Sequence, residues 1–326
     1  MRMTCIRTAA ATGAATLLFS LLVAAAAVAQ QPVFSPIVTG HRVVAGLAVD
    51  GRIYAGLAKG GVVEWDIVDE TALRSLDRGS GLSGHYVQDI GWSGSRLLIA
   101  FGDGGITAIS NPGTSDEFMQ LYRDGLASLD VTCVTGQQIG GSERIYYGTA
   151  ADGIGVIDGG REGAYFSTLD GLIADEIVDV VLSGDLLLVA TPIGLSRFAS
   201  NVFTNYRYDE TGMAQVNALA ATADGAIWAA TDDGVKRWDD AARDWIDVLG
   251  SDNRYNALAV AGTEVYSLRN DGVIARVEGD GGYTIAATDA PDGYRIRTAS
   301  VIAVGGEPWV GGSLRLETHI PGSRVE

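Results

Sequence analysis

Four polar side chains lie at two adjacent positions of similar β-prone segments. Their carboxylate and amide groups suit a hard cation. Asp89 and Asp179 take one position of this segment, and Asn217 and Asn256 take the position directly before it. Calcium accepts carboxylate and amide oxygens as ligands, and a bound cation can activate water for hydrolysis. Carboxylates that are only solvated in a channel account for the same residues. We prefer this second interpretation and keep a metal-dependent hydrolase or lactonase as an alternative function.

A basic set of residues lies close to the start of the same segments. It comprises Arg42, His85, Arg254, Arg295 and Arg297. The planar guanidinium group matches carboxylate and phosphate, and several such groups on one rim repel each other unless an anion offsets them. The corresponding places in the middle of the chain are acidic: Asp130, Asp175 and Glu176. The pattern predicts that a small anionic ligand, or an acidic group on a protein partner, binds to the basic set.

The basic set can also arise without any ligand. Chance can place surface charge at these positions. Asp103, Asp252 and Asp271 are also expected on the same side, where they can neutralise the basic side chains in ion pairs. The acidic remainder of the chain would also slow an approaching anion, although salt screens charges beyond about 10 Å.

No other motif indicates catalysis, a metal or a cofactor. His41, His85 and His319 lack the spacing of zinc ligands, and no G-x-S-x-G motif marks a nucleophile. Glycine-rich turns lie between β-prone runs and never before a helix that could bind phosphate. Asp-Gly pairs such as Asp224-Gly225 are typical of hairpin turns. We therefore predict no catalytic residue, no metal and no cofactor.

The elements that would position these residues are clearest in residues 216–239. An apolar run from Val216 reaches an Ala-Asp-Gly turn, a second run covers 227–231, and a third follows Asp233-Gly234. This pattern predicts three short strands joined by two tight hairpins. One such unit cannot bury both faces of its sheet, so copies of it must pack on either side.

The rest of the chain repeats this unit. The centres of the second strands are aromatic or apolar and follow one another at intervals of 44, 48, 42, 40, 38 and 43 residues. They are Tyr54, Leu98, Tyr146, Leu188, Trp228, Tyr266 and Trp309. Most copies add a fourth β-prone run, and 44 glycines suit frequent tight turns. We predict an all-β fold, a seven-bladed β-propeller of four-stranded antiparallel blades.

The two ends of the propeller are expected to close on each other. The last copy has an inner run, a second run and a third run at residues 314–317, but no fourth run follows. Near the N-terminus, residues 34–40 match the outer strand and turn at 166–171. We predict that residues 33–38 complete the last blade, because a closed ring leaves no exposed sheet edge.

The first 29 residues have the pattern of a secretory signal peptide. Arg2 and Arg7 precede an apolar run, and an A-x-A cleavage site ends at Ala29. A membrane anchor is the alternative, although the run is shorter than the roughly 20 residues that a span needs. We predict a signal peptide over 1–29 and one propeller domain over 30–326. The protein is expected to be periplasmic or extracellular, with no membrane insertion after cleavage.

The remaining chain is acidic and holds one cysteine. The formal charge of −17 becomes −19 once the two arginines of residues 1–29 are removed. This charge argues against nucleic acid and anionic membranes as partners. Cys5 leaves with the signal peptide, so Cys133 has no partner for an intrachain disulfide. Cys133 falls at a small-residue position of an inner strand and is expected to be packed and unreactive.

Residues 216–239 resemble the two-component-regulator propeller repeat. In that repeat an inner strand and an Asp-Gly turn precede a strand like L-W-I-G-T and a strand like G-L-x-R-Y-D. Gly-Leu turns beginning at Gly81, Gly125 and Gly171 are also typical of it. The resemblance covers nearly all of 32–326 and implies an extracytoplasmic propeller that senses a ligand or binds a protein. The start of the chain is also similar to propellers of the PorZ type.

These patterns together predict a binding module without catalysis. The chain is expected to act as a sensor-like or scaffold propeller and as a monomer. Its ligand or protein partner would bind at the mouth of the central channel. A secretion or cell-envelope accessory protein is a further alternative, beside the metal-dependent hydrolase.

Overall fold

The computed structural model describes residues 42–69, 71–211, 213–239, 244–250, 253–270, 273–277, 283–286, 294–304 and 307–316. For the last three of these ranges it describes the backbone alone. The chain divides into two compact units, residues 1–37 and 38–326, and every described residue belongs to the second. The predicted signal peptide, the predicted closing strand at 33–38, Asp252 and Asp271 lie outside the described residues.

Six four-stranded antiparallel sheets follow one another along the chain. The first contains β1 (Val43–Val49), β2 (Arg52–Leu57), β3 (Val62–Asp66) and β4 (Thr71–Leu76). The second contains β5 (Val87–Trp92), β6 (Arg96–Phe101), β7 (Gly105–Ser110) and β8 (Phe118–Tyr122). The third contains β9 (Val131–Ile139), β10 (Ser142–Thr149), β11 (Ile154–Asp158) and β12 (Arg161–Phe166), and the short helix η1 (Thr168–Asp170) follows it.

The second half of the chain continues the series. The fourth sheet contains β13 (Asp179–Ser183), β14 (Leu186–Thr191), β15 (Gly194–Ala199) and β16 (Val202–Arg207), and the helix α2 (Tyr208–Thr211) follows it. The fifth contains β17 (Val216–Ala221), β18 (Ile227–Thr231), β19 (Gly234–Asp239) and β20 (Asp244–Leu249). The sixth contains β21 (Tyr255–Ala261), β22 (Glu264–Arg269), β23 (Ile274–Val277) and β24 (Tyr283–Ala286). A seventh sheet pairs β25 (Tyr294–Val304) with β26 (Glu307–Leu316).

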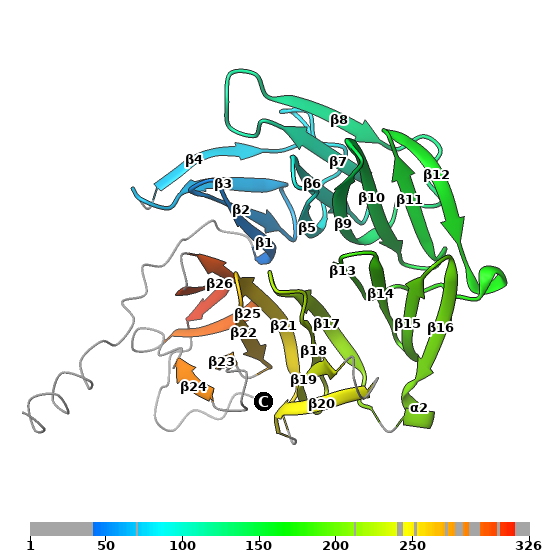
Figure 1. Cartoon of the computed structure of the whole chain (residues 1–326). Helices are drawn as coiled ribbons and strands as arrows, with labels where there is room; N and C mark the ends of the chain where they lie inside the picture. Colours follow the sequence, from blue (N-terminus) through cyan, green and yellow to red (C-terminus); the bar gives the residue numbers. More distant parts are fainter. Residues whose placement is uncertain are drawn as a thin grey trace, which may run out of the picture. The chain divides into compact units, whose positions relative to one another are not determined.

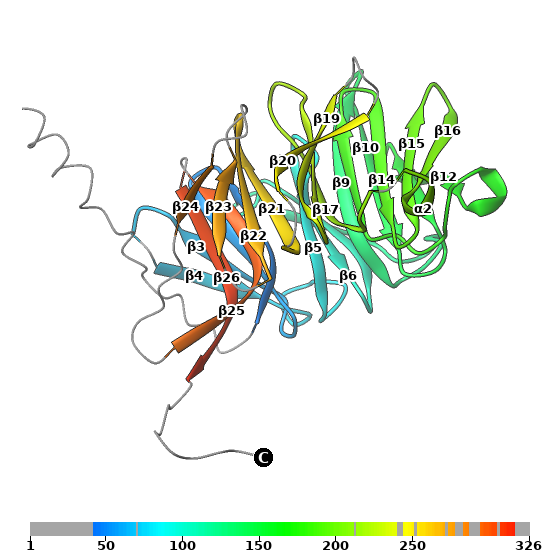
Figure 2. The same cartoon turned by 90° about the horizontal axis from the view of Figure 1, so that it is seen from below.

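The sheets form a ring around their first strands (Figure 1). β1 packs beside β5, each later first strand packs beside the next, and β25 lies against β1. After a turn of 90°, the strands are seen to run between the two faces of this ring (Figure 2). This is the arrangement of a β-propeller, so the predicted all-β fold of four-stranded antiparallel blades is confirmed for six blades. No helix in the described part of the chain is long and apolar enough to cross a membrane.

The predicted count of seven four-stranded blades is wrong for the described chain, which has six. The seventh sheet has two strands within the described residues. Residues 314–316 were expected to turn back as a third strand, but they continue β26 and pair with residues 294–296. Gly311 and Gly312 do not form a hairpin, because they lie inside β26 opposite an irregularity of β25 at residues 298–300.

Glycine is required where the second strand turns into the third. Gly153 and Gly234 have φ angles of 82° and 104°. A Cβ atom would lie 2.2 Å from the carbonyl oxygen of Phe166 in the first case, and 2.2 Å from that of Leu249 in the second. The outer strand thus crosses the turn at a distance that only a residue without a side chain allows.

Apolar cores fill the spaces between neighbouring sheets. In one cluster Leu98 and Ile106 of the second sheet pack with Val131, Ile145 and Tyr147 of the third, and all five side chains are fully buried. Burial of each such side chain contributes about 1.5–3 kcal/mol. The second strands of the first five sheets are buried between two neighbouring sheets, so they are apolar almost throughout. This run of apolar residues makes the repeat visible in the sequence.

The inner strands share an irregularity near their starts, where one residue falls between paired neighbours. It occurs in β1, β5, β9, β17, β21 and β25. The residues concerned are Val44, Gln88, Thr132, Asn217, Asn256 and Ala299. A bulge re-aims side chains locally. Among the described side chains the residue before the bulge is buried, as at Val87, Val131 and Val216, and the bulge residue itself is more exposed.

Candidate functional site

Asp89 and Asp179 join neighbouring blades in the wall of the channel. Asp89 Oδ2 accepts a hydrogen bond of 2.9 Å from the backbone N–H of Val134 on β9. Asp179 Oδ2 accepts one of 2.7 Å from the backbone N–H of Leu219 on β17. The second oxygen of each carboxylate accepts the N–H of the following residue at 2.8 Å. Each carboxylate thus connects its own inner strand to the inner strand of the next blade.

Both channel carboxylates have raised pKa values. Burial, followed by the negative charge of Asp89, raises the pKa of Asp179 to about 7. Burial also raises the pKa of Asp89. The backbone N–H donors act in the opposite direction, because they stabilise the charged form. Asp179 therefore gains or loses its proton near neutral pH.

The contacts of these carboxylates and of the two asparagines are hydrogen bonds within the protein. Among the described residues, no group of three or more His, Cys, Asp or Glu side chains is placed to hold a metal. Asn217 and Asn256 were considered as further ligands, but their Oδ1 atoms lie 3.1 and 3.0 Å from the guanidinium nitrogens of Arg254. Each oxygen of the two carboxylates already accepts one backbone N–H.

A repeated backbone hydrogen bond identifies matching residues on the rim of the channel mouth. The carbonyl oxygen of the residue just before an inner strand accepts an N–H from the turn between the second and third strands of the same blade. Five blades have this bond, at Arg42, Tyr86, Asp130, Gln215 and Arg254. In the seventh sheet the pairing of β25 with β26 places Arg297 at the same position, two residues before the bulge residue Ala299. We call these positions the rim.

Three arginines occupy the rim in consecutive sheets. Arg254 belongs to the sixth sheet, Arg297 to the seventh and Arg42 to the first, and the inner strands of these sheets are neighbours. Asp130 holds the same position in the third sheet. The rim positions of these three neighbouring sheets are therefore arginines, whereas the rim position of the third sheet is an aspartate.

Arg254 is held in place by its neighbours but remains half exposed. Its Nε lies 3.2 Å from Asp232 Oδ1, and 51% of its side-chain surface is exposed. Asn217 Nδ2 donates to the same oxygen of Asp232 at 2.8 Å and to the carbonyl oxygen of Tyr255 at 2.9 Å. These bonds fix the guanidinium group and leave further N–H donors for a ligand.

His85 lies beside the rim and is paired with Asp103. The Nδ1 atom of His85 is 3.4 Å from Asp103 Oδ2, and Arg78 lies 3.3 Å from the same carboxylate. Asp103 Oδ1 accepts the backbone N–H groups of His85 and Tyr86 at 2.8 and 3.1 Å. Burial acts to raise the pKa of Asp103, but these hydrogen bonds and Arg78 lower it overall. At this part of the mouth Asp103 therefore neutralises basic side chains in ion pairs.

The structure describes the side chain of Arg42, but only the backbone of Arg295 and Arg297. Arg42 is exposed and forms no ion pair with any described residue. Arg295 and Arg297 lie in β25, where they pair with Arg315 and Ser313. The side chains of both lie outside the described part of the structure, so their role stays a prediction.

Sequence analysis missed Lys59 and Arg78 at this mouth. Lys59 lies on the turn of the first blade, with its Nζ 5.9 Å from the centre of the Tyr86 ring. This distance is typical of a cation–π contact. The next residue, Gly60, donates its N–H to the carbonyl oxygen of His85 at 3.2 Å. A lysine directly before the Gly60-Gly61 turn was the available signal.

Comparison with solved structures supports the fold. The chain is similar to the extracellular domain of the hybrid two-component system BT4673 from B. thetaiotaomicron, with 15% identity, a TM-score of 0.66, and coverage of 83% of this chain and 39% of that one. It is similar to PorZ, a surface component of the type-IX secretion system of Porphyromonas gingivalis, with 18% identity, a TM-score of 0.58, and coverage of 87% and 39%. Streptogramin B lyase gives 14% identity, a TM-score of 0.64, and coverage of 87% and 96%.

The shared feature is a propeller. At such identities the likeness concerns the fold alone, and at that level it confirms the resemblance to propellers of two-component regulators. The chain spans about two fifths of the length of the extracellular domains of BT4673 and BT3049, between 39% and 42%. No protein-family model and no curated protein matches the sequence.

Proposed function

We propose that this chain is a secreted binding propeller that holds an acidic ligand or partner at the mouth of its channel and catalyses no reaction. The main support is the rim position shared by Arg254, Arg297 and Arg42 in consecutive sheets. Like charges so arranged repel unless an anion lies among them. Within the described residues, Asp232 pairs with Arg254, and no acidic side chain pairs with Arg42.

An acidic peptide segment of a protein partner suits this rim best. The guanidinium group binds carboxylates in a planar, two-bonded geometry. The three arginines belong to three neighbouring sheets. A ligand with several acidic groups can contact them together.

The channel supports binding over catalysis. Its two carboxylates each accept two backbone N–H groups, so they act as connections between blades. One similar fold belongs to a lyase, so the fold alone does not decide the question. The proposal rests on the arrangement of the site.

An extracytoplasmic location is supported by two independent observations. Residues 1–29 have the signal-peptide pattern, and a similar fold is found within the extracellular domains of BT4673 and BT3049. A sensor-like or scaffold role fits such a location. A role as a secretion or envelope accessory protein would also use the mouth as a protein-binding surface, as the surface component PorZ has a similar propeller.

We further propose that residues 33–38 pair with β26 as the outer strand of the seventh sheet. The seventh sheet has two strands within the described residues, and β26 lies at its edge. An open edge is a template for pairing with another chain. Closure by the N-terminal segment would remove this edge and keep the protein monomeric.

Binding of a fluorescent polyglutamate peptide, at low and at high salt, tests the proposed site. The variant Arg254→Ala/Arg297→Ala should bind the peptide at least about tenfold more weakly at low salt, and this difference should shrink as salt screens the charges. Arg123→Ala/Arg161→Ala removes the same charge from exposed positions after β8 and in β12, and should bind like the wild type. Full binding by the rim variant would remove these residues from the site.

A further inference from the structure

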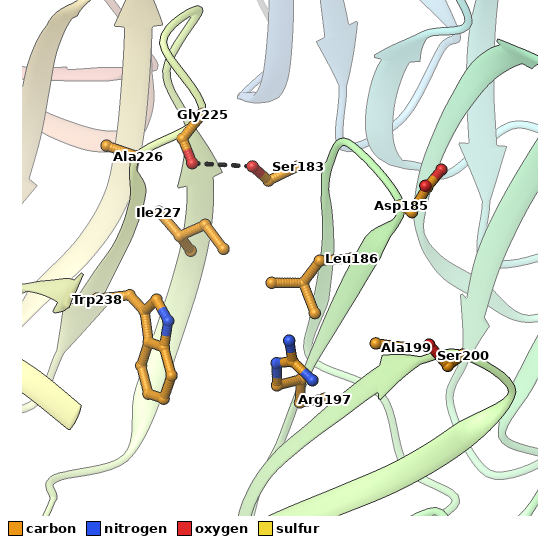
Figure 3. Close-up of a pocket in the computed structure, with 10 residues that line it drawn as sticks. All are labelled: Ser183, Asp185, Leu186, Arg197, Ala199, Ser200, Gly225, Ala226, Ile227 and Trp238. Atoms are coloured by element: carbon orange, nitrogen blue, oxygen red, sulfur yellow. Dashed lines mark hydrogen bonds between the residues drawn. The ribbon is translucent and has the colours of Figure 1, made fainter. Parts of the chain in front are cut away.

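A pocket of about 340 Å³ opens between the fourth and fifth sheets, near the hairpins between first and second strands (Figure 3). Its lining includes Ser183, Leu186 and Arg197 from the fourth sheet, and Ile227 and Trp238 from the fifth. The rim lies at the opposite ends of the inner strands, so the pocket and the rim are on opposite faces. Ligand pockets commonly begin at about 300 Å³.

The position of Arg197 in the repeat accounts for the charge in the pocket. Arg197 stands opposite Leu188, the centre of the second strand of its blade. In the first blade the same position is held by Glu64, opposite Tyr54, and Glu64 forms an ion pair with Arg52. In the first blade, the residue at this position of the third strand is therefore the acidic partner of an ion pair.

The sixth blade has the same ion pair with its signs exchanged. Arg276 stands opposite Tyr266 and pairs with Glu264, which lies two residues before Tyr266. Arg52 likewise lies two residues before Tyr54 in the first blade. In the fourth blade the equivalent residue is Leu186, which has no charge to offer. Arg197 therefore stands where two other blades have a paired charge, but its partner position is apolar.

No other group replaces the missing partner. Arg197 is half-buried, and its side chain forms no hydrogen bond or ion pair with any described residue. Asp185 lines the same pocket, but its carboxylate is directed away from Arg197 (Figure 3). Ser183 Oγ is engaged by the carbonyl oxygen of Gly225, to which it donates a hydrogen bond of 2.8 Å. A guanidinium group that is partly removed from water and unpaired attracts an anion strongly.

Apolar side chains lie next to this charge. Leu186, Ile227 and Trp238 flank Arg197, as Figure 3 shows. The same residues border a second, small cavity of about 10 Å³, which is also lined by Leu188 and Tyr206. Trp238 is steadied by Tyr206 and Trp245, with ring centres 5.8 and 5.5 Å away. The site therefore offers one cation beside a rigid apolar wall.

We propose that this pocket binds a small carboxylate with an aromatic or other planar apolar body. The carboxylate takes the place of the missing acidic partner of Arg197, and the apolar body packs on Trp238, Leu186 and Ile227. The site is separate from the rim, and it does not depend on the function proposed for the rim.

Calorimetric titration with benzoate tests the proposal. We expect the wild type to bind benzoate with a dissociation constant of about 1 mM or tighter, and benzamide, the neutral analogue, at least about tenfold more weakly. Arg197→Leu should weaken benzoate binding at least about tenfold. Arg276→Leu removes an arginine from the same repeat position in a blade where it is paired, and should leave benzoate binding unchanged. The rim variant Arg254→Ala/Arg297→Ala should also bind benzoate normally.

Three results would overturn the proposal. These are no benzoate binding by the wild type at about 10 mM, equal binding by Arg197→Leu, and equal affinity for benzamide. Thermal unfolding controls for the fold, and Arg197→Leu should not lower the unfolding temperature because it breaks no ion pair. If that variant were nevertheless unstable, Trp238→Leu would be titrated in its place. The proposal expects weaker benzoate binding by Trp238→Leu, and unchanged binding would contradict it.

Discussion

Asp179 on β13 is joined to Leu219 on β17 by a hydrogen bond of 2.7 Å that crosses from one blade to the next. Asp89 and Val134 form the same contact between β5 and β9. Apolar packing between neighbouring blades has no direction, whereas hydrogen bonds between them do. These two carboxylates add a directional contact that fixes the inner strands relative to one another.

The first prediction concerns pH. The folded-state pKa of Asp179 is about 7, against an ordinary value of 3.8, so the folded protein binds this proton more tightly than the unfolded chain. Its contribution to stability is complete below about pH 4 and is lost as the pH rises through about 7, by at most about 4 kcal/mol. Asp179→Asn should remove this loss, so that its urea unfolding free energy changes less than that of the wild type over this range.

Asp185→Asn is the matched control, because Asp185 is an exposed carboxylate of the same sheet. It should follow the wild-type pH dependence. If Asp179→Asn also followed the wild-type curve between about pH 4 and about pH 7, the raised pKa of Asp179 would be wrong.

The second prediction concerns Glu64, which is fully buried and paired with Arg52 and Arg74. Glu64→Ala should lower the free energy of unfolding by about 3 kcal/mol, because it leaves partly buried guanidinium groups without their anion. Asp158→Ala removes the anion of an exposed pair with Arg144 and should cost less than about 1 kcal/mol. Equal losses in urea unfolding would show that Glu64 stabilises no more than a surface ion pair.

The third prediction concerns Cys133, which is 2% exposed. Burial, then the charges of Asp179 and Asp89, raise the pKa of its thiol well above the usual value. The native protein without residues 1–29 should therefore react slowly with a thiol reagent, and the urea-unfolded protein should react at once. Rapid stoichiometric labelling of the native protein would contradict the packed position.

The fourth prediction concerns the seventh blade. Deletion of residues 32–40 should expose the edge at β26, lower the stability by several kcal/mol and promote self-association. Thermal unfolding and light scattering measure the two effects. An unchanged unfolding temperature together with a monodisperse monomer would show that residues 33–38 do not cover the edge of β26.

The sequence predicts the six complete blades because their signal comes from burial. Tyr54, Leu98, Tyr146 and their equivalents lie at the centres of second strands covered on both faces, so they must be apolar in every copy. The turn glycines are required by φ and by space, as at Gly153 and Gly234. Residues constrained in this way recur at a fixed spacing, and the spacing reveals the fold.

The prediction for the seventh sheet was wrong because glycine occurs both in hairpin turns and inside strands at irregularities. Gly311-Gly312 has the composition of a hairpin turn, but opposite the irregularity in β25 it continues a strand. Local sequence does not distinguish the two cases, since the difference lies in the partner strand. The long β26 therefore could not be predicted from its own residues.

The candidate sites were predicted unevenly for a similar reason. Arg254 was found because it precedes a recognisable inner strand, whereas its partners Asp232 and Asn217 come from another blade. The pocket beside Arg197 was missed because it arises from an uncharged residue, Leu186, at a position where other blades carry a charge. Such a difference becomes visible only once the ladder register is known.

The most direct test of the central claim is where an acidic peptide binds. A spin-labelled polyglutamate peptide broadens the amide signals of residues close to it in the NMR spectrum of the isotope-labelled protein. We predict broadening of Arg42, Tyr86 and Arg254 on the rim, and none at Gly184 and Gly225 beside the pocket of the opposite face. Broadening at the opposite face alone, or no broadening at the rim, would contradict the proposal that the channel mouth binds acidic groups.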